Sequence, residues 1–138
     1  MKISTRARYG LRLMYELALH YGEKPVILKD IAKAQEISEK YLGQLIIPLR
    51  ASGLVQGSRG AHGGYRLARP PSAITIHQIV EILEGDLAIV ECTVHPDVCK
   101  RAGRCVTRAL WTDLKDIIDG SLQKVSLQDL LSKHNRQE

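Results

Sequence analysis

Apolar residues recur every three or four positions along most of this chain, which is the spacing of amphipathic helices. A first helix is predicted over 4–21, with Ser4 or Thr5 as its N-terminal cap. A second helix is predicted over 28–35 and a third over 38–52. Two short helices joined by a tight turn, the second with a small polar outer face, form the helix-turn-helix pattern of DNA-binding proteins.

The pattern changes after the third helix. Two short apolar runs at 54–58 and 65–68 flank a glycine-rich tip, which predicts a β-hairpin. A hairpin directly after the second helix of a helix-turn-helix is the element order of a winged helix. Arg59 lies at the base of this wing, where an arginine on a slim hairpin can reach into the minor groove of DNA.

Helical spacing returns in the C-terminal half. Thr75 opens a fourth helix with a capping box, and Gly85 ends it. A fifth helix is predicted over 104–119, ended by Gly120, and Ser126 caps a short last helix. The fifth helix has more apolar surface than a terminal helix of a small monomer needs, so the first helix, a partner subunit or both should cover it.

Length and charge narrow the class of protein. The 138 residues suit one domain, and 44% hydrophobic residues without phenylalanine favour a helical, aliphatic core. The formal net charge of +5 suggests a polyanionic partner. The chain has no membrane-spanning run and no signal-peptide core at its start, so we expect a cytoplasmic protein. We find no catalytic triad, paired carboxylates or phosphate loop, so we do not expect an enzyme.

All three cysteines lie in one segment without periodicity, as Cys92, Cys99 and Cys105. This clustering predicts thiol or metal chemistry. With His95 they would form a Cys₃His set, which is a normal tetrahedral zinc site. The alternative is metal-free thiols controlled by oxidation, because neighbouring cations lower thiol pKa values. Those cations are Lys100, Arg101 and Arg104. A thiol oxidoreductase would usually carry C-x-x-C, which is absent.

Four stretches carry a resemblance to a known family. They are MKISTRARYGLR at the start, ISEKYLGQLIIPLRASGLV in the helix-turn-helix, SRGAHGGYRL in the wing and CVTRALW after the last cysteine. They resemble the IscR-type winged-helix transcriptional regulators of bacteria, whose relatives include NsrR, RirA and CymR. The resemblance covers nearly the whole chain.

The resemblance implies a DNA-binding repressor that forms a symmetric homodimer through its long C-terminal helix and binds a near-palindromic operator. We therefore expect a mainly α fold with a small β-hairpin, divided into a winged helix-turn-helix (1–85), a cysteine-bearing sensor loop (86–103) and a dimerisation helix with a C-terminal helix (104–138).

The same resemblance implies which residues meet the DNA. The recognition-helix residues are Ser38, Lys40, Tyr41 and Gln44. The wing residues are Arg59 and His62, and the phosphate contacts near the N-terminus are Thr5, Arg6 and Tyr9. Gly43 departs from family members that have a larger polar residue at this position.

Members of the family with an iron–sulfur cluster have three cysteines at similar spacing. The resemblance therefore implies that the three thiols hold a 2Fe-2S or 4Fe-4S cluster. One branch adds a histidine three residues after the last cysteine, where this chain has Arg108. Another adds an aspartate near the start of the partner's first helix, where this chain has Arg8. Within the loop, His95 has the most suitable donor for the fourth position.

The N-terminal half is especially similar to the CymR branch, which lacks the cysteines. The alternative to a cluster protein is therefore a cluster-free regulator that is controlled by thiol oxidation or by a protein partner.

Overall fold

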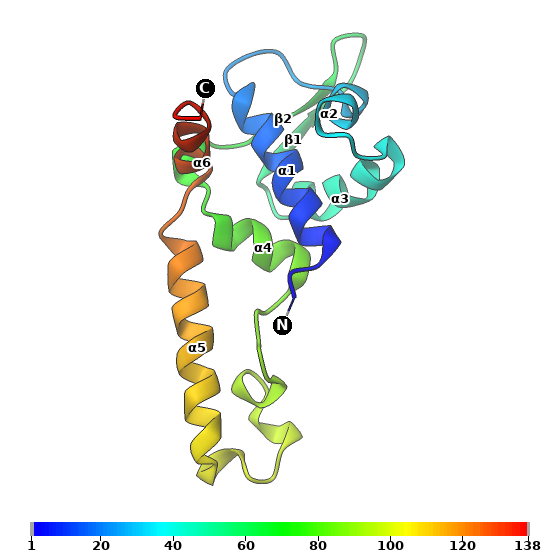
Figure 1. Ribbon diagram of the computed structural model, residues 1–138. Helices are drawn as coiled ribbons and strands as arrows, with labels where there is room; N and C mark the ends of the chain where they lie inside the picture. The colour runs from blue at the N-terminus through cyan, green and yellow to red at the C-terminus, as the bar shows by residue number, and fades with distance from the viewer. Residues whose placement is uncertain (1, 138) are drawn as a thin grey trace.

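The first half of the chain folds into three helices that pack against one another (Figure 1). They are α1 (Thr5–Leu19), α2 (Leu28–Gln35) and α3 (Glu39–Ala51). This computed structural model describes residues 2–137, and Met1 and Glu138 lie outside the described residues. The side chains of Ser4 and Ser38 each accept a hydrogen bond from a backbone N–H of the first turn that follows. These caps satisfy otherwise unpaired donors, which fixes where α1 and α3 begin.

A two-stranded antiparallel hairpin follows α3, formed by β1 (Val55–Ser58) and β2 (Gly64–Leu67). It is anchored to the segment before α2 by two backbone hydrogen bonds of 2.8 Å between Val26 and Tyr65. Gly64 permits this close approach, since a Cβ there would lie 2.6 Å from the carbonyl oxygen of Val26. Three helices and this hairpin confirm the predicted winged helix, a mainly α fold with a small β-hairpin.

An aliphatic core joins the three helices to a fourth, α4 (Ile76–Glu84). The predicted capping box at its start is confirmed, because the side chains of Thr75 and Gln78 each bond the other's backbone N–H. The largest fully buried side chains are Leu13, Met14, Leu17, Ile31, Leu42, Leu45, Leu49, Ile74, Ile79 and Leu127. Leucine and isoleucine side chains, together with Met14, therefore fill the core without any phenylalanine.

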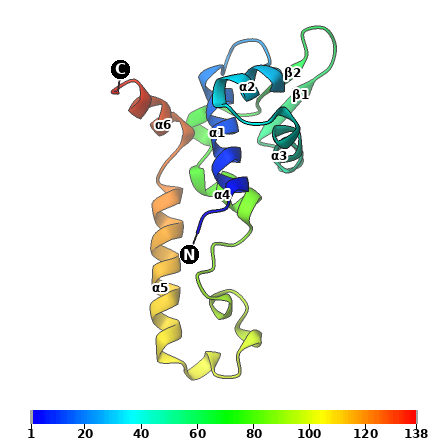
Figure 2. The same cartoon turned by 45° about the vertical axis from the view of Figure 1, so that its right-hand side comes forward.

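After Gly85 the chain leaves the winged domain and forms an arm (Figures 1 and 2). The outgoing half contains three 3₁₀ turns, at Glu91–Thr93, Pro96–Val98 and Ala102–Arg104. The returning half is α5 (Val106–Gln123), in which no residue is buried. This helix continues through Gly120, where the sequence had predicted its end, because Gly120 keeps a negative φ instead of the positive φ of a helix-ending glycine. No helix within residues 2–137 is long and apolar enough to cross a bilayer.

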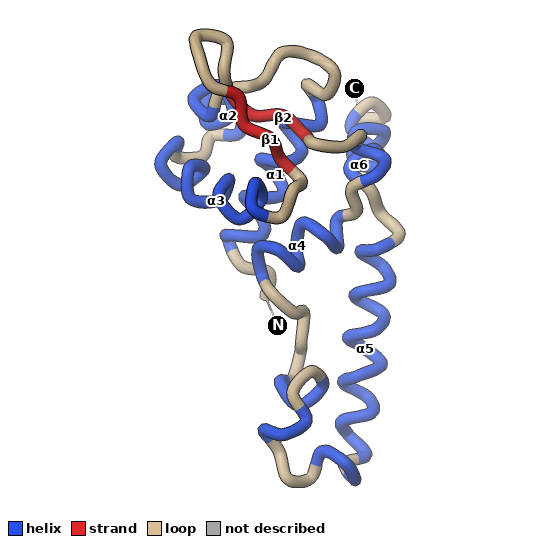
Figure 3. Tube along the Cα trace, turned by 180° about the vertical axis from the view of Figure 1, so that it is seen from behind, coloured by secondary structure: helices blue, strands red, loops and turns tan. Residues whose placement is uncertain are grey.

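The last helix, α6 (Leu127–His134), returns to the winged domain (Figure 3). Leu127 is fully buried in the core, and α6 packs against α1. Two backbone hydrogen bonds join the connection between α5 and α6 to the start of α4. The N–H of Ile76 donates to the carbonyl oxygen of Val125 at 2.8 Å, and the N–H of Leu127 donates to that of Ile74 at 3.0 Å. Both ends of the arm are thus fixed to the winged domain, while its far end projects away.

Candidate DNA-binding surface and cysteine loop

The outer face of α3 carries the residues expected at the bases. Lys40 and Gln44 are exposed, whereas the inward positions of the same helix are buried in the core. Ser38 is committed to the N-terminal cap, where its hydroxyl accepts the N–H of Tyr41 at 3.2 Å. The Tyr41 ring lies edge-on to that of Tyr9, with centroids 6.0 Å apart. The structure therefore brings two predicted contact residues from different helices together at one surface.

Near the start of α1 the arginines have intramolecular partners. Arg6 donates from Nε to the carbonyl oxygen of Leu83 at 3.1 Å, which satisfies a free acceptor near the end of α4. Arg8 donates to the Thr5 hydroxyl at 3.1 Å. Both side chains are exposed, as is Thr5. The predicted phosphate contacts at Thr5 and Arg6 would have to form alongside these bonds.

A polar network beneath this surface was not predicted from the sequence. Glu16 is 8% exposed and accepts a hydrogen bond from the Gln35 side-chain amide at 2.8 Å. The Gln35 side-chain oxygen in turn accepts the Arg12 Nε–H at 3.0 Å, and the Arg12 guanidinium lies 5.2 Å from the centroid of the Tyr9 ring. This network links α1 to the end of α2. It therefore fixes the helix-turn-helix relative to the surface that carries Tyr9.

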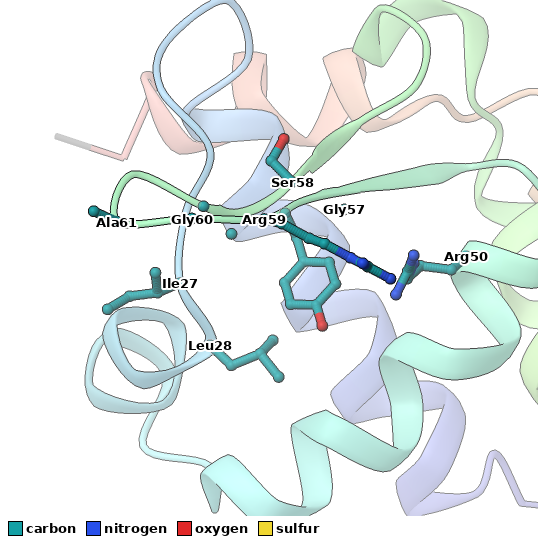
Figure 4. Close-up of a pocket in the computed structure, with 11 residues that line it drawn as sticks. Ile27, Leu28, Arg50, Gly57, Ser58, Arg59, Gly60 and Ala61 are labelled. Carbon is teal, nitrogen blue, oxygen red and sulfur yellow. The ribbon is translucent and has the colours of Figure 1, made fainter.

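An open hollow of about 490 Å³ lies beneath the wing, and it is also lined by Ile27 and Leu28 at the start of α2 and by Arg50 of α3 (Figure 4). Arg59 from the wing and Arg50 from the end of α3 point toward each other across it. Neither arginine has a carboxylate within ion-pair distance among residues 2–137. His62 lies exposed at the tip of the same hairpin. Two like charges that converge without an internal counter-ion create a strongly positive site at the wing.

The cysteines lie on the outgoing half of the arm, beside the N-terminal half of α5. Cys92 and Cys105 are partly buried and Cys99 is exposed, and all three are free thiols. A hydrogen bond with the Thr107 hydroxyl, at 3.2 Å, and the backbone N–H of Arg108 lower the pKa of the Cys105 thiol. Arg108 also donates from Nε to the carbonyl oxygen of Cys92 at 2.9 Å. This last bond ties the loop directly to α5.

The loop does not gather its donors in this conformation. Within residues 2–137 no three His, Cys, Asp or Glu side chains are placed to hold a metal ion. His95 points its Nε2 toward Asp86, at 3.7 Å from the carboxylate, and is mostly exposed. No cysteine belongs to the hydrophobic core, so core packing does not fix where the thiols lie.

A second polar link joins α5 to the winged domain at the base of the arm. His77 on α4 lies 3.2 Å from the Asp119 carboxylate on α5, which also forms an ion pair with Lys115. Burial opposes ionisation of Asp119, but the hydrogen bonds from Lys115 and His77 outweigh it and lower the pKa of this carboxyl group. The charged form is therefore favoured at the point where α5 meets α4.

These features define a winged-helix DNA-binding regulator: a helix-turn-helix with an exposed polar recognition face, a wing with converging arginines and an arm suited to subunit contact. The chain belongs to the Rrf2 family of transcriptional regulators. The family's profile, named "Iron-dependent Transcriptional regulator", matches residues 3–133.

Individual relatives are similar over most of their length. CymR of Bacillus subtilis is 45% identical over 132 residues, which cover 96% of this chain and 91% of CymR. The solved structure of that protein has a TM-score of 0.81 and covers 96% of this chain and 98% of its own. IscR of Photorhabdus laumondii is 38% identical, covering 96% of this chain and 80% of that protein. The structure of T. potens IscR is 41% identical with a TM-score of 0.80, covering 97% and 88%.

These findings confirm the family that the sequence motifs indicated, the winged-helix fold and the expectation of a regulator instead of an enzyme. Transcriptional regulation through DNA binding is the activity of the family.

Proposed function

We propose that this protein is a homodimeric, operator-binding repressor whose affinity for DNA is set by the state of its cysteine loop. The observation that carries this proposal is the position of the thiols. All three lie in the segment between α4 of the winged domain and α5, which carries an exposed apolar face. A change in the loop therefore acts where the two DNA-reading domains of a dimer would be joined.

In this proposal α3 lies in the major groove, with Lys40 and Gln44 facing the bases. Tyr41 and Ser38 flank them, and Tyr9 adds a contact beside Tyr41. Side chains near the start of α1 meet phosphates, as does the wing residue His62. Arg59 enters the minor groove, where narrow A·T-rich segments have an enhanced negative potential.

Control by the loop follows from the bonds that hold it. The thiols of Cys92, Cys99 and Cys105 form a donor set that suits an iron–sulfur cluster, with His95 as the fourth donor. Such a cluster would supply redox sensitivity and would be lost when iron or sulfide is scarce. Gathering the thiols would move the Cys92 carbonyl that Arg108 holds, and so bias the position of α5. A cluster can change the affinity for DNA only as far as it binds one position of α5 more tightly than the other.

Protein prepared without oxygen is expected to contain iron and acid-labile sulfide in equal amounts and to absorb visible light. Iron and sulfide analysis with absorbance spectra provides the measurement. Cys99→Ser should remove both the absorbance and the sulfide, whereas Ser132→Ala, at an exposed position of α6, serves as the control and should not. Protein that holds zinc, or no metal after anaerobic reconstitution with iron and sulfide, would rule out the cluster.

A cluster-free regulator is the second candidate function. It is supported by the 45% identity to CymR of Bacillus subtilis and by Arg8 and Arg108, neither of which can supply an ordinary fourth ligand. The lowered pKa of the Cys105 thiol favours control by oxidation in this case, because the thiolate is the reactive form. A partner protein would be revealed by co-purification in the absence of DNA.

Arg59→Ala is expected to weaken binding to a selected operator by about tenfold or more and to flatten the preference for A·T-rich sequence beneath the wing. Fluorescence anisotropy with operators that differ only in that segment measures both effects. Arg66→Ala is the matched control, because Arg66 is exposed on the wing but alternates to the face opposite Tyr65. Equal losses for the two variants, or no loss for Arg59→Ala, would contradict the proposed minor-groove contact.

A further inference from the structure

The recognition helix exposes one large apolar side chain to water. Ile47 is 66% exposed, whereas the four other aliphatic residues in the middle of α3 are buried. Those buried residues are Leu42, Leu45, Ile46 and Leu49. Ile47 lies seven residues after Lys40 and three after Gln44, so it shares their outward face. Ile47 is therefore an apolar side chain on the otherwise polar outer face of α3, where it is free to contact a bound partner.

The surface next to Ile47 is open because of Gly43. A Cβ added to Gly43 would meet nothing within 4 Å, and the residue does not have a positive φ. Neither packing nor backbone conformation therefore requires glycine here, although glycine inside a helix is unfavourable relative to alanine. Helical side chains tilt toward the N-terminus, so Ile47 lies over the surface that Gly43 leaves bare. What a glycine permits at this point is close approach of something outside the chain.

The hollow beside this bare surface has an apolar side and a cationic side. Its volume is about 440 Å³, and it is lined by Gly43, Ile46, Ile47, Arg50, Ala51 and Tyr65. Arg50 and Tyr65 also line the hollow beneath the wing, so the two openings adjoin one another. A nucleotide in the major groove offers the complementary pair of groups, since thymine carries a C5-methyl group on its exposed edge and a phosphate on its backbone. A purely apolar protein partner would leave Arg50 unmatched.

We propose that Ile47 is a specificity-determining residue that contacts the C5-methyl group of one thymine in each operator half-site, in the space left by Gly43. Arg50 holds the neighbouring phosphate from the other side of the hollow. This inference rests on the proposed DNA-binding function and deepens it. A larger polar residue at position 43 would contact a base directly. In this chain Ile47, one turn later, makes an apolar contact with a base instead.

The test removes the methyl group from the DNA and the side chain from the protein in turn. An operator is first enriched from random DNA with the wild-type protein, and each thymine of the half-site is then replaced singly by deoxyuridine, which pairs identically but lacks the methyl group. At one thymine, the wild type should lose about fourfold in affinity per half-site, the value of one buried methyl group. Ile47→Ala should bind more weakly than the wild type and should not respond to uracil at that thymine.

Controls separate this contact from a general loss. Ile47→Ala should retain the melting temperature of the wild type, because the side chain is mostly in water. Ile27→Ala removes another exposed isoleucine of the helix-turn-helix and should keep the uracil response. Uracil effects that are absent at every thymine, or equal in the wild type and Ile47→Ala, would overturn the inference while leaving DNA binding intact. If no operator can be enriched, the proposed DNA-binding function fails and this inference fails with it.

Discussion

Replacing Leu110 and Ile117 together with glutamate is expected to make the protein monomeric and to weaken binding to a two-half-site operator by about 10²- to 10⁴-fold, the range lost when a bivalent contact becomes monovalent. These side chains are 52% and 66% exposed, and they lie on one face of α5 with Val106 and Leu114. Spacings of three and four residues make this a continuous apolar stripe on a helix without a buried residue. An exposed apolar face of this kind is typical of an interaction site, and we propose that a second copy of this chain covers it.

Sedimentation velocity would report the oligomeric state. Fluorescence anisotropy on DNA with one or two half-sites would separate loss of avidity from loss of half-site affinity in each DNA-binding domain. The monomer should bind a single half-site as well as one wild-type domain does. Gln123→Glu combined with Gln128→Glu adds the same two charges outside the stripe, so it controls for general repulsion from DNA. A double-glutamate variant that stays dimeric, or a monomer with undiminished affinity for two half-sites, would rule out α5 as the dimer interface.

The winged domain could be predicted from the sequence because its signals are local. A cap such as Ser38 or a capping box such as Thr75 with Gln78 acts within one turn of helix, so the sequence alone fixes where the helix begins. The hairpin was predicted from its glycine-rich tip for the same reason. The continuation of α5 through Gly120 was missed because glycine ends a helix only when the chain turns there, and neighbours distant in sequence decide that.

The hydrogen bonds between residues far apart in the sequence could not be predicted from local sequence patterns. The family resemblance implied phosphate contacts near the N-terminus, including one from Arg6. It could not show that Arg6 bonds the carbonyl of Leu83 or that Arg12 bonds Gln35. These partners lie 77 and 23 residues away. Burial of Glu16 depends on the same tertiary network.

The candidate sites also have features that the sequence could predict and features that only the fold shows. The position of the cysteine loop between the winged domain and α5 followed from the order of elements along the chain. The arrangement of the thiols did not follow, because no core contact holds them and ligand binding would decide it. Exposure of Ile47 could have been inferred from the phase of α3, since every neighbouring aliphatic residue falls on the opposite face. Its convergence with Arg50 and the wing required the fold.

The contact between α1 and α4 should depend on the absence of a side chain at Gly10. A Cβ at this buried position would overlap Cδ1 of Leu83, which is itself 5% exposed and has little room to move. The same interface carries the Arg6 bond to the Leu83 carbonyl and a bond from the Ser4 N–H to Glu84, so α4 is aligned on α1 at the point where the chain departs for the cysteine loop. A tight fit here positions the arm as well as stabilising the core.

Gly10→Val is therefore expected to lower the free energy of unfolding by about 2 kcal/mol, the usual cost of overpacking a core. Gly43→Val is the matched control, because a Cβ at this position would meet nothing within 4 Å and valine should slightly stabilise the helix relative to glycine. Leu83→Ala alone should cost about 2–5 kcal/mol by leaving a cavity, but Gly10→Val should recover part of that loss because valine fills the space. Urea unfolding at one fixed protein concentration measures all four variants, including the double variant. Additive losses in the double variant, or equal effects of valine at positions 10 and 43, would show that the Gly10–Leu83 contact does not control the packing of α4 on α1.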